Sequence, residues 1–227
     1  MLTVSDLWQT TWPGAKQGVL IMRDVANPTQ HPELDQRKSE LEQELRARFA
    51  NHSKAALNAL PSIKPYADYY NRFKKTYHVA LQLESVALKG KSLPRVAALV
   101  EAMFMAELKN QLLTAGHDFD SLRAPLTLDI ARGDEQYVLL NGKEETIKAG
   151  DICMSDSAGV VGCIIYGPDQ RTRITPATRN VLFTVYAPPG IENQAIRQHL
   201  EDIAANVRLI APSASTQELA VYEANPA

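Results

Sequence analysis

The order of hydrophobic patterns along the chain is the feature that most restricts its fold. Apolar residues recur at helical spacing between residues 32 and 109, and short strand-like runs then follow between 112 and 187. A last helical pattern spans residues 192–208. Helices followed by strands, without a regular alternation, predict an α+β protein in which mixed or antiparallel sheets pack with helices.

Individual elements can be assigned from turn signals and periodicity. Pro32 suits the first turn of a long helix that we expect to end at Pro61, and the Asn141-Gly142 pair is typical of a hairpin turn. The expected helices are 32–60, 62–78, 81–89, 95–109 and 192–208, and the expected strands are 18–24, 112–115, 126–131, 137–140, 151–154, 160–166 and 181–187.

These elements predict a division of the chain into three parts. Residues 1–60 are an N-terminal strand and long helix packed on the core, and residues 61–210 are the main domain. Residues 211–227 are a C-terminal tail that is either loose or docks one short segment around 219–222. We expect the three parts to form one globular unit.

Composition excludes several classes of protein. A chain of 227 residues can bury a sizeable core, and its formal net charge of −2 argues against a strongly basic nucleic-acid-binding protein. No apolar run approaches the ~20 residues that span a bilayer, and the N-terminus lacks the pattern of a signal peptide. We therefore expect a cytoplasmic protein with neither a membrane nor a DNA partner.

The stretch from Gly159 to Arg173 combines a buried strand with a polar loop. Its apolar run ends at Gly167-Pro168-Asp169, a strong turn signal, and a carboxylate, two guanidiniums and a hydroxyl follow at once. Such a loop is either a binding-site scaffold or a hairpin corner with solvated charges.

Few residues suggest direct chemistry. His117 and Asp118 follow a strand, where a histidine beside a carboxylate can act as a general base or orient substrate. The alternative is a turn in which Asp118 bonds backbone amides. The five histidines are scattered and no nucleotide-binding motif is present, so we expect no metal and no cofactor.

A basic and aromatic segment occupies residues 62–78. Tyrosine and phenylalanine side chains alternate there with Arg72, Lys74 and Lys75, a composition that can bind single-stranded nucleic acid by stacking and phosphate pairing. The alternative is an amphipathic helix with buried aromatic and exposed basic side chains.

Four stretches in order resemble the B3/B4 domain, the tRNA-editing module of the bacterial phenylalanyl-tRNA synthetase beta subunit, and free-standing proteins built from that domain. The stretches are LESVALKGKSLPRVAALVEAMF, LLTAGHDFDSL, NGKEETIKAGDICMSD and GVVGCIIYGPDQRTRITPATRNVLFTVYAP. Together they cover roughly half of the chain. The resemblance implies an editing pocket between strands and helices, where water hydrolyses the ester that joins a wrong amino acid to a tRNA.

The resemblance also implies site residues. It places Gly162 on the pocket-lining glycine of the family, and Thr184 where the synthetase has an acidic residue that recognises the tyrosine hydroxyl, which puts tyrosine as the substrate in doubt. The expected substrate-binding residues are Gly162, Asp169, Arg171, Thr172, Thr178, Asn180 and Thr184, with His117 and Asp118 as the catalytic residues and Arg72, Lys74 and Lys75 as the RNA-binding residues.

The function implied is a trans-acting aminoacyl-tRNA deacylase, a hydrolase that binds the acceptor end of tRNA and holds the amino-acid moiety in its pocket. Such hydrolysis needs little covalent chemistry from the protein, because a positioned water and preorganised donors can suffice. Two other functions stay open: a module that binds an amino acid or small metabolite without turnover, and an RNA- or protein-interaction domain.

Overall fold

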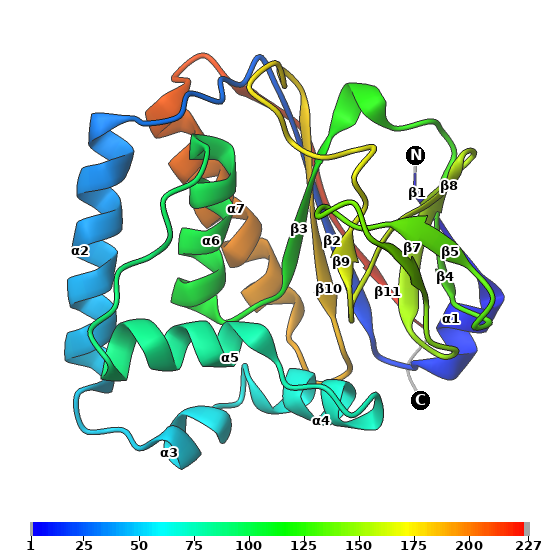
Figure 1. Cartoon of the computed structure of the whole chain (residues 1–227), viewed down its shortest axis with the longest axis horizontal. Helices are drawn as coiled ribbons and strands as arrows, with labels where there is room; N and C mark the ends of the chain where they lie inside the picture. Colours follow the sequence, from blue (N-terminus) through cyan, green and yellow to red (C-terminus); the bar gives the residue numbers. More distant parts are fainter. Residues whose placement is uncertain (1, 225–227) are drawn as a thin grey trace.

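The computed structural model describes residues 2–224 and arranges them in three layers (Figure 1). Most helices form one outer layer, a four-stranded sheet lies in the middle, and a second sheet, with the short N-terminal helix beside it, forms the other side. The α-helices are α1 Asp6–Thr11, α2 Pro32–Phe49, α3 Lys54–Asn58, α4 Lys64–Arg72, α5 His78–Leu83, α6 Ala98–Asn110 and α7 Asn193–Ile210. The strands are β1 Leu2–Val4, β2 Lys16–Arg23, β3 Thr114–Asp118, β4 Leu126–Ile130, β5 Gln136–Val138, β6 Glu144–Thr146, β7 Ile152–Asp156, β8 Gly159–Cys163, β9 Gly167–Pro168, β10 Val181–Ala187 and β11 Ser215–Glu223.

The middle sheet joins segments from both ends of the chain. Its order is β11-β2-β10-β3, and every neighbouring pair is antiparallel. Strand β10 is buried along its whole length because helices cover one face and the second sheet covers the other. The C-terminal residues 215–223 thus form a full strand rather than a loose tail, since β2 offers them a partner along its entire edge.

The second sheet has the order β1-β4-β7-β8-β9, with β1 parallel to β4 and the other pairs antiparallel. A separate hairpin joins β5 and β6 through the turn at Asn141-Gly142, where Gly142 has φ +83°. The sheet pairs Cys153 directly with Cys163, and both are buried free thiols.

Helix α7 packs on the middle sheet through its apolar stripe of Ile196, Leu200, Ile203 and Val207. Gly18 in β2 permits the close approach, because a Cβ at that position would lie 2.6 Å from Ile196 Cγ2. Helix α6 packs beside α7, and α2 lies outside both (Figure 1).

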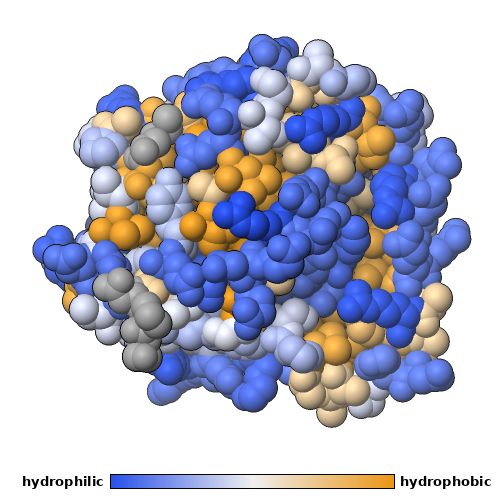
Figure 2. All heavy atoms as spheres, turned by 180° about the vertical axis from the view of Figure 1, so that it is seen from behind, coloured by the Kyte–Doolittle hydropathy of each residue, from blue (hydrophilic) through white to orange (hydrophobic). Residues whose placement is uncertain are grey.

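Hydrophilic side chains cover much of the opposite face of the molecule, and apolar patches show between them (Figure 2).

The α+β class predicted from the sequence is confirmed, whereas several element boundaries were wrong, among them the end of the helix expected at 62–78, which stops at Arg72. The helix expected to reach residue 60 ends at Phe49, and a new helix starts after Ser53, whose side chain accepts the Ala56 N–H. The strand expected at 160–166 ends at Cys163. Residues 164–166 turn away from the strand.

Buried polar groups hold this turn. Asp151 accepts the Ile165 N–H at 3.1 Å and the Tyr69 hydroxyl at 2.6 Å, and the Tyr70 hydroxyl donates to Ile164 O at 2.9 Å. Burial raises the pKa of Asp151 to about 6. Long-range contacts of this kind override the β-propensity of the Ile164-Ile165 pair.

The aromatic residues of the basic and aromatic segment belong to the core, as the amphipathic alternative predicts. Tyr66, Tyr69, Tyr70, Phe73 and Tyr77 are buried. Base stacking on these rings is therefore excluded, and only the exposed basic side chains of the segment remain available to a partner.

Within residues 2–224, no helix is both long and apolar enough to cross a membrane.

Candidate functional site

The end of β3 and the loop after β9 meet, as required if both contribute to one site. The Asp118 N–H donates to Thr172 O at 2.7 Å, and His117 Nδ1 lies 2.7 Å from Thr172 Oγ1. The Thr172 hydroxyl also donates to Asp169, whose pKa is raised by burial. Four of the residues proposed from the sequence therefore form one hydrogen-bonded cluster.

His117 lies in the interior of this cluster. It has no exposed surface, and burial, with a contribution from the Arg171 charge, lowers its pKa to about 4. Its Nε2 is buried without a hydrogen-bond partner within residues 2–224. The imidazole is thus neutral at physiological pH and is separated from solvent.

Asp118 is bound by Thr178. The Thr178 hydroxyl donates to Asp118 Oδ2 at 2.6 Å, while Asp118 Oδ1 accepts the Asp120 N–H at 3.1 Å. Asn180 donates to Asp120 Oδ2 at 2.7 Å. Thr178 and Asn180 therefore support the loop around Asp118, which also contains the turn that the alternative interpretation predicted.

Arg171 stabilises the loop after β9 through contacts on its outer side. Its guanidinium donates to Asp156 Oδ1 at 2.9 Å and to Ser121 O at 2.9 Å, and Nε lies 3.6 Å from Asp169 Oδ2. The Asp156 side chain is fully buried, so this ion pair supplies the positive charge beside a carboxylate that water does not reach.

Gly162 lies in β8 of the second sheet and Thr184 in β10 of the middle sheet, and neither lines the polar or the apolar hollow described below. A Cβ on Gly162 would lie 3.4 Å from Gly167 O, from Pro168 Cα and from the Tyr186 hydroxyl, so the glycine allows three groups to approach. Thr184 is buried in the middle sheet, where it accepts from Gln17 and donates to Gly18 O at 3.2 Å.

A polar hollow of about 470 Å³ opens beside the cluster. Of the residues proposed from the sequence, Asp118, Asp169 and Arg171 line it; Gln136, Gln170 and Arg173 add further polar groups. His117 does not contribute to its wall.

An apolar hollow of about 450 Å³ lies on the other side of Arg173, between α6, β3 and the turn at 163–168. Its volume falls within the range of small-molecule sites. Apolar side chains dominate its wall, among them Val100, Met103, Phe104, Leu113, Ile164 and Ile174. Arg173 lines both the apolar hollow and the polar one.

The site residues inferred from the sequence leave out several polar residues that line the apolar hollow, among them Glu107, Tyr186 and Arg173. Tyr186 is 2% exposed and its hydroxyl has no hydrogen-bond partner among the described residues. The available signal was Glu107 itself, a glutamate on the buried side of a largely apolar helix.

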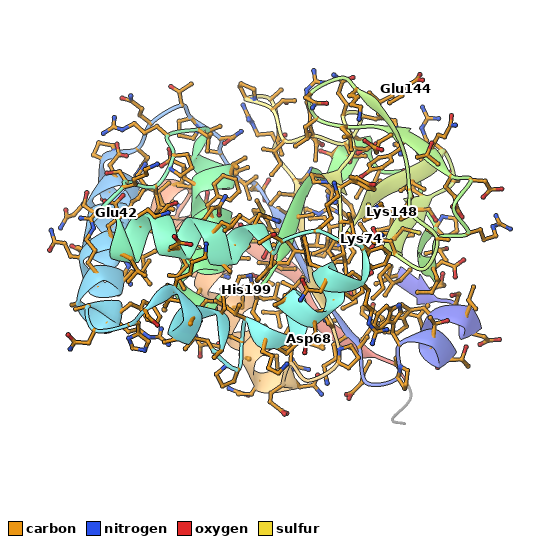
Figure 3. All side chains as sticks on the ribbon, turned by 60° about the horizontal axis from the view of Figure 1, so that its bottom comes forward. Glu42, Asp68, Lys74, Glu144, Lys148 and His199 are labelled. Carbon is orange, nitrogen blue, oxygen red and sulfur yellow. The ribbon has the colours of Figure 1, made fainter. Side chains whose placement is uncertain are left out.

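Two of the three basic residues proposed from the sequence, Arg72 and Lys74, border a third, basic hollow of about 570 Å³. Arg72, Lys74 and Lys148 line it together with Trp12. Lys74 and Lys148 lie close together beside the end of α4 (Figure 3). Lys75 lies outside this hollow, with its ammonium 5.5 Å from the ring centroid of Tyr166, and Tyr166 lines the apolar hollow. Lys75 therefore lies between the two hollows.

Comparison with known proteins identifies the family. Residues 66–208 match the family model described as "B3/4 domain". The phenylalanine–tRNA ligase beta subunit of Mycoplasma genitalium is 32% identical over 69 residues, which are 30% of this chain and 9% of that protein. The same subunit of Mycoplasma pneumoniae is 28% identical over 93 residues, 40% of this chain and 12% of that protein.

The matched regions thus span about a tenth of the length of these relatives. Among solved structures, an N-terminal fragment of the phenylalanyl-tRNA synthetase beta subunit from Pyrococcus horikoshii has a TM-score of 0.48 at 11% identity, covering 96% of this chain and 54% of that one. Because the family model matches well over half of its residues, the chain belongs to the B3/4 domain family.

Proposed function

We propose that this protein is a trans-acting deacylase that hydrolyses the ester of mischarged aminoacyl-tRNA. The observation that carries the proposal is the pair of hollows on the two sides of Arg173, one apolar and one polar. The aminoacyl end of a tRNA likewise has two parts of different polarity, because one ester joins the amino acid with its side chain to a polar nucleoside. Membership of the B3/4 family and the likeness to synthetase beta subunits support this reading.

In this proposal the apolar hollow holds the amino-acid side chain and the polar hollow holds the terminal nucleoside. The ester then lies beside Arg173. The guanidinium of Arg173 donates one bond to Gln170 O at 3.2 Å, which leaves other N–H groups for the ester oxygen. A fixed cation at the developing oxyanion lowers the barrier to attack by water.

The backbone after Gly167 is a poorer oxyanion site. The Asp169 N–H donates to Val161 O and the Gln170 N–H donates to Val138 O, both at 2.8 Å, so neither is free. Asp118 lines the polar hollow and is the carboxylate that we assign to orienting the attacking water. His117 acts behind it, as a positioning residue that holds Thr172 and the loop.

The acceptor end of the tRNA would follow the basic residues. Lys75 lies between the apolar hollow and the basic hollow, and Arg72, Lys74 and Lys148 continue the positive surface. Phosphate pairing with exposed cations needs no base stacking, in agreement with the burial of the tyrosines.

The test is a deacylation assay over a panel of mischarged tRNAs. We expect faster release of at least one amino acid than in protein-free controls, and a loss of at least tenfold in kcat/KM for Arg173→Ala. Arg179→Ala is the matched control, since Arg179 is exposed and contacts Pro176 O and Thr178 O instead of lining either hollow. Absence of turnover on every aminoacyl ester would refute the enzymatic proposal.

The buried position of His117 favours one second candidate, binding of an amino acid or small metabolite without turnover. A ligand present at 100 times its Kd raises the unfolding free energy by about 2.7 kcal/mol. Stabilisation by amino acids together with intact aminoacyl-tRNA would therefore support this candidate over the deacylase.

A further inference from the structure

Glu107 is a buried carboxyl group at the wall of the apolar hollow. It is 2% exposed, its Oε1 accepts the Thr114 N–H at 2.7 Å, and its Oε2 makes no hydrogen bond within residues 2–224. Burial raises its pKa to about 8. A carboxyl group in this position costs stability unless something else compensates it.

A second glutamate on α6 illustrates a buried carboxylate whose charge is compensated by an ion pair. Glu101 is also buried, but the Lys38 ammonium lies 2.5 Å from its Oε2, and its Oε1 accepts the Val96 N–H at 2.8 Å. Glu107 has no such ion pair among the described residues. The two glutamates differ in one further respect, because only Glu107 lines a hollow that a ligand can enter.

The surroundings of Glu107 suit a cation. The stacked rings of Tyr66 and Tyr77, with centroids 4.5 Å apart, and the ring of Tyr70 lie near its carboxyl group. Burial raises the pKa of all three hydroxyls, and the proximity of Glu107 adds to the effect. These three rings lie outside the wall of the apolar hollow, whose own aromatic side chains include Phe104, Tyr166 and Tyr186. Aromatic rings beside a carboxylate are a general means of binding ammonium groups in an apolar site.

We propose that Glu107 forms an ammonium subsite: its carboxyl group releases its proton to solvent when the ligand binds, and its free oxygen then pairs with a primary ammonium group of the ligand held in the apolar hollow. The inference deepens the proposed function and rests on it for the identity of the substrate as an aminoacyl ester. Two sources can supply the ammonium group: the α-amino group, which every aminoacyl ester carries, or a side chain that ends in an amine.

Binding measurements with small esters separate these sources. Leucine methyl ester carries only the α-ammonium, Nα-acetyl-lysine methyl ester carries only the side-chain ammonium, and N-acetyl-leucine methyl ester carries neither. We expect the wild-type protein to bind one of the first two, by calorimetry or thermal shift, at least tenfold more tightly than the third. Equal binding of all three esters would overturn the subsite.

The variant Glu107→Gln provides the residue-level test. Glutamine keeps an oxygen acceptor for the Thr114 N–H, so the fold is expected to persist, while the charge that binds ammonium is lost. We expect at least tenfold weaker binding of the ammonium-bearing ester. Glu33→Gln, on the exposed start of α2, is the matched control and should bind as the wild type does.

The outcomes distinguish this inference from the proposed function. Tight binding of an ammonium-bearing ester that depends on Glu107, without deacylation, supports the subsite and refutes the deacylase. Deacylation of aminoacyl-tRNA by Glu107→Gln with the kcat/KM of the wild type supports the deacylase and refutes the subsite. Unchanged affinity in Glu107→Gln refutes the subsite directly.

Discussion

His117 Nδ1 lies 2.7 Å from Thr172 Oγ1, and the same hydroxyl donates its proton to Asp169. Because that proton is already used, the imidazole must donate from Nδ1, which leaves Nε2 as a bare lone pair in the interior. The assignment follows from the hydrogen-bond network. This chain of three side chains ties strand β3 to the loop that lines the polar hollow.

Removing the central hydroxyl should loosen this connection. Thr172→Val keeps the shape of the side chain but leaves the His117 N–H without an acceptor, which costs about 1–3 kcal/mol for a buried donor. Denaturant unfolding measures the loss. Thr76→Val, at an exposed position, is the control and should change stability by no more than about 0.5 kcal/mol. Equal stability of the two variants would contradict the network.

The low pKa of His117, about 4, predicts acid sensitivity. Between pH 6.5 and 4 the unfolded chain binds a proton at this site that the folded protein does not, so stability falls with decreasing pH by up to about 1.4 kcal/mol per unit. His117→Gln removes this contribution. We expect the stability difference between wild type and variant to narrow as the pH falls from 6.5 to 4.5, and parallel pH curves would argue against a buried neutral histidine.

Glu107 predicts the opposite trend. Its pKa is raised to about 8, so between about pH 4.3 and 8 the folded protein holds a proton that the unfolded chain has released. Stability from this site is complete at low pH and is lost as the pH rises toward 8, again by up to about 1.4 kcal/mol per unit. Glu107→Gln should therefore gain stability relative to wild type from pH 5 to 8, measured by denaturant unfolding at each pH. A constant difference would mean that Glu107 is ionised in the fold.

Arg171 and Arg173 should behave differently although they are two residues apart. Arg171→Ala deprives the buried Asp156 of its ion pair and is expected to cost about 1.5–3 kcal/mol, the range for hydrogen bonds to charged groups. Arg173→Ala removes one exposed bond to a backbone carbonyl and should leave stability within about 0.5 kcal/mol. Thermal unfolding of both variants checks this. Equal losses of stability in the two variants would contradict a structural role for Arg171 and a ligand-facing role for Arg173.

Local patterns were enough to predict the strands and helices whose periodicity matches their burial. Strand β10 has the bounds that its apolar run predicts, and α7 begins and ends within two residues of the expected range 192–208. The turn at 164–166 could not be predicted in this way, because Asp151 and Tyr70 hold it from distant parts of the sequence. For strand β11 the sequence indicated at most a short docked segment around 219–222, since its mixed sequence forms a full strand only where β2 offers a partner.

The candidate site, too, could be predicted from the sequence only in part. The loop residues Asp118, Asp169 and Arg171 could be found because their polar side chains follow turn signals, and the structure brings them together at the polar hollow. The apolar hollow is built from α6 and β3, which read as ordinary core in the sequence. Whether a buried glutamate pairs with a lysine, as Glu101 does, or lines a hollow, as Glu107 does, depends on tertiary packing alone.

The basic hollow predicts how tRNA binding should depend on salt concentration. If Lys74 and Lys148 contact phosphates, each substitution by alanine should weaken tRNA binding and reduce the slope of log K against log salt concentration by about 1. Fluorescence anisotropy over a series of salt concentrations measures both quantities. Lys89→Ala is the control, because Lys89 is exposed and pairs with Glu84 away from this hollow. An unchanged slope in Lys74→Ala and Lys148→Ala would show that the RNA follows another surface.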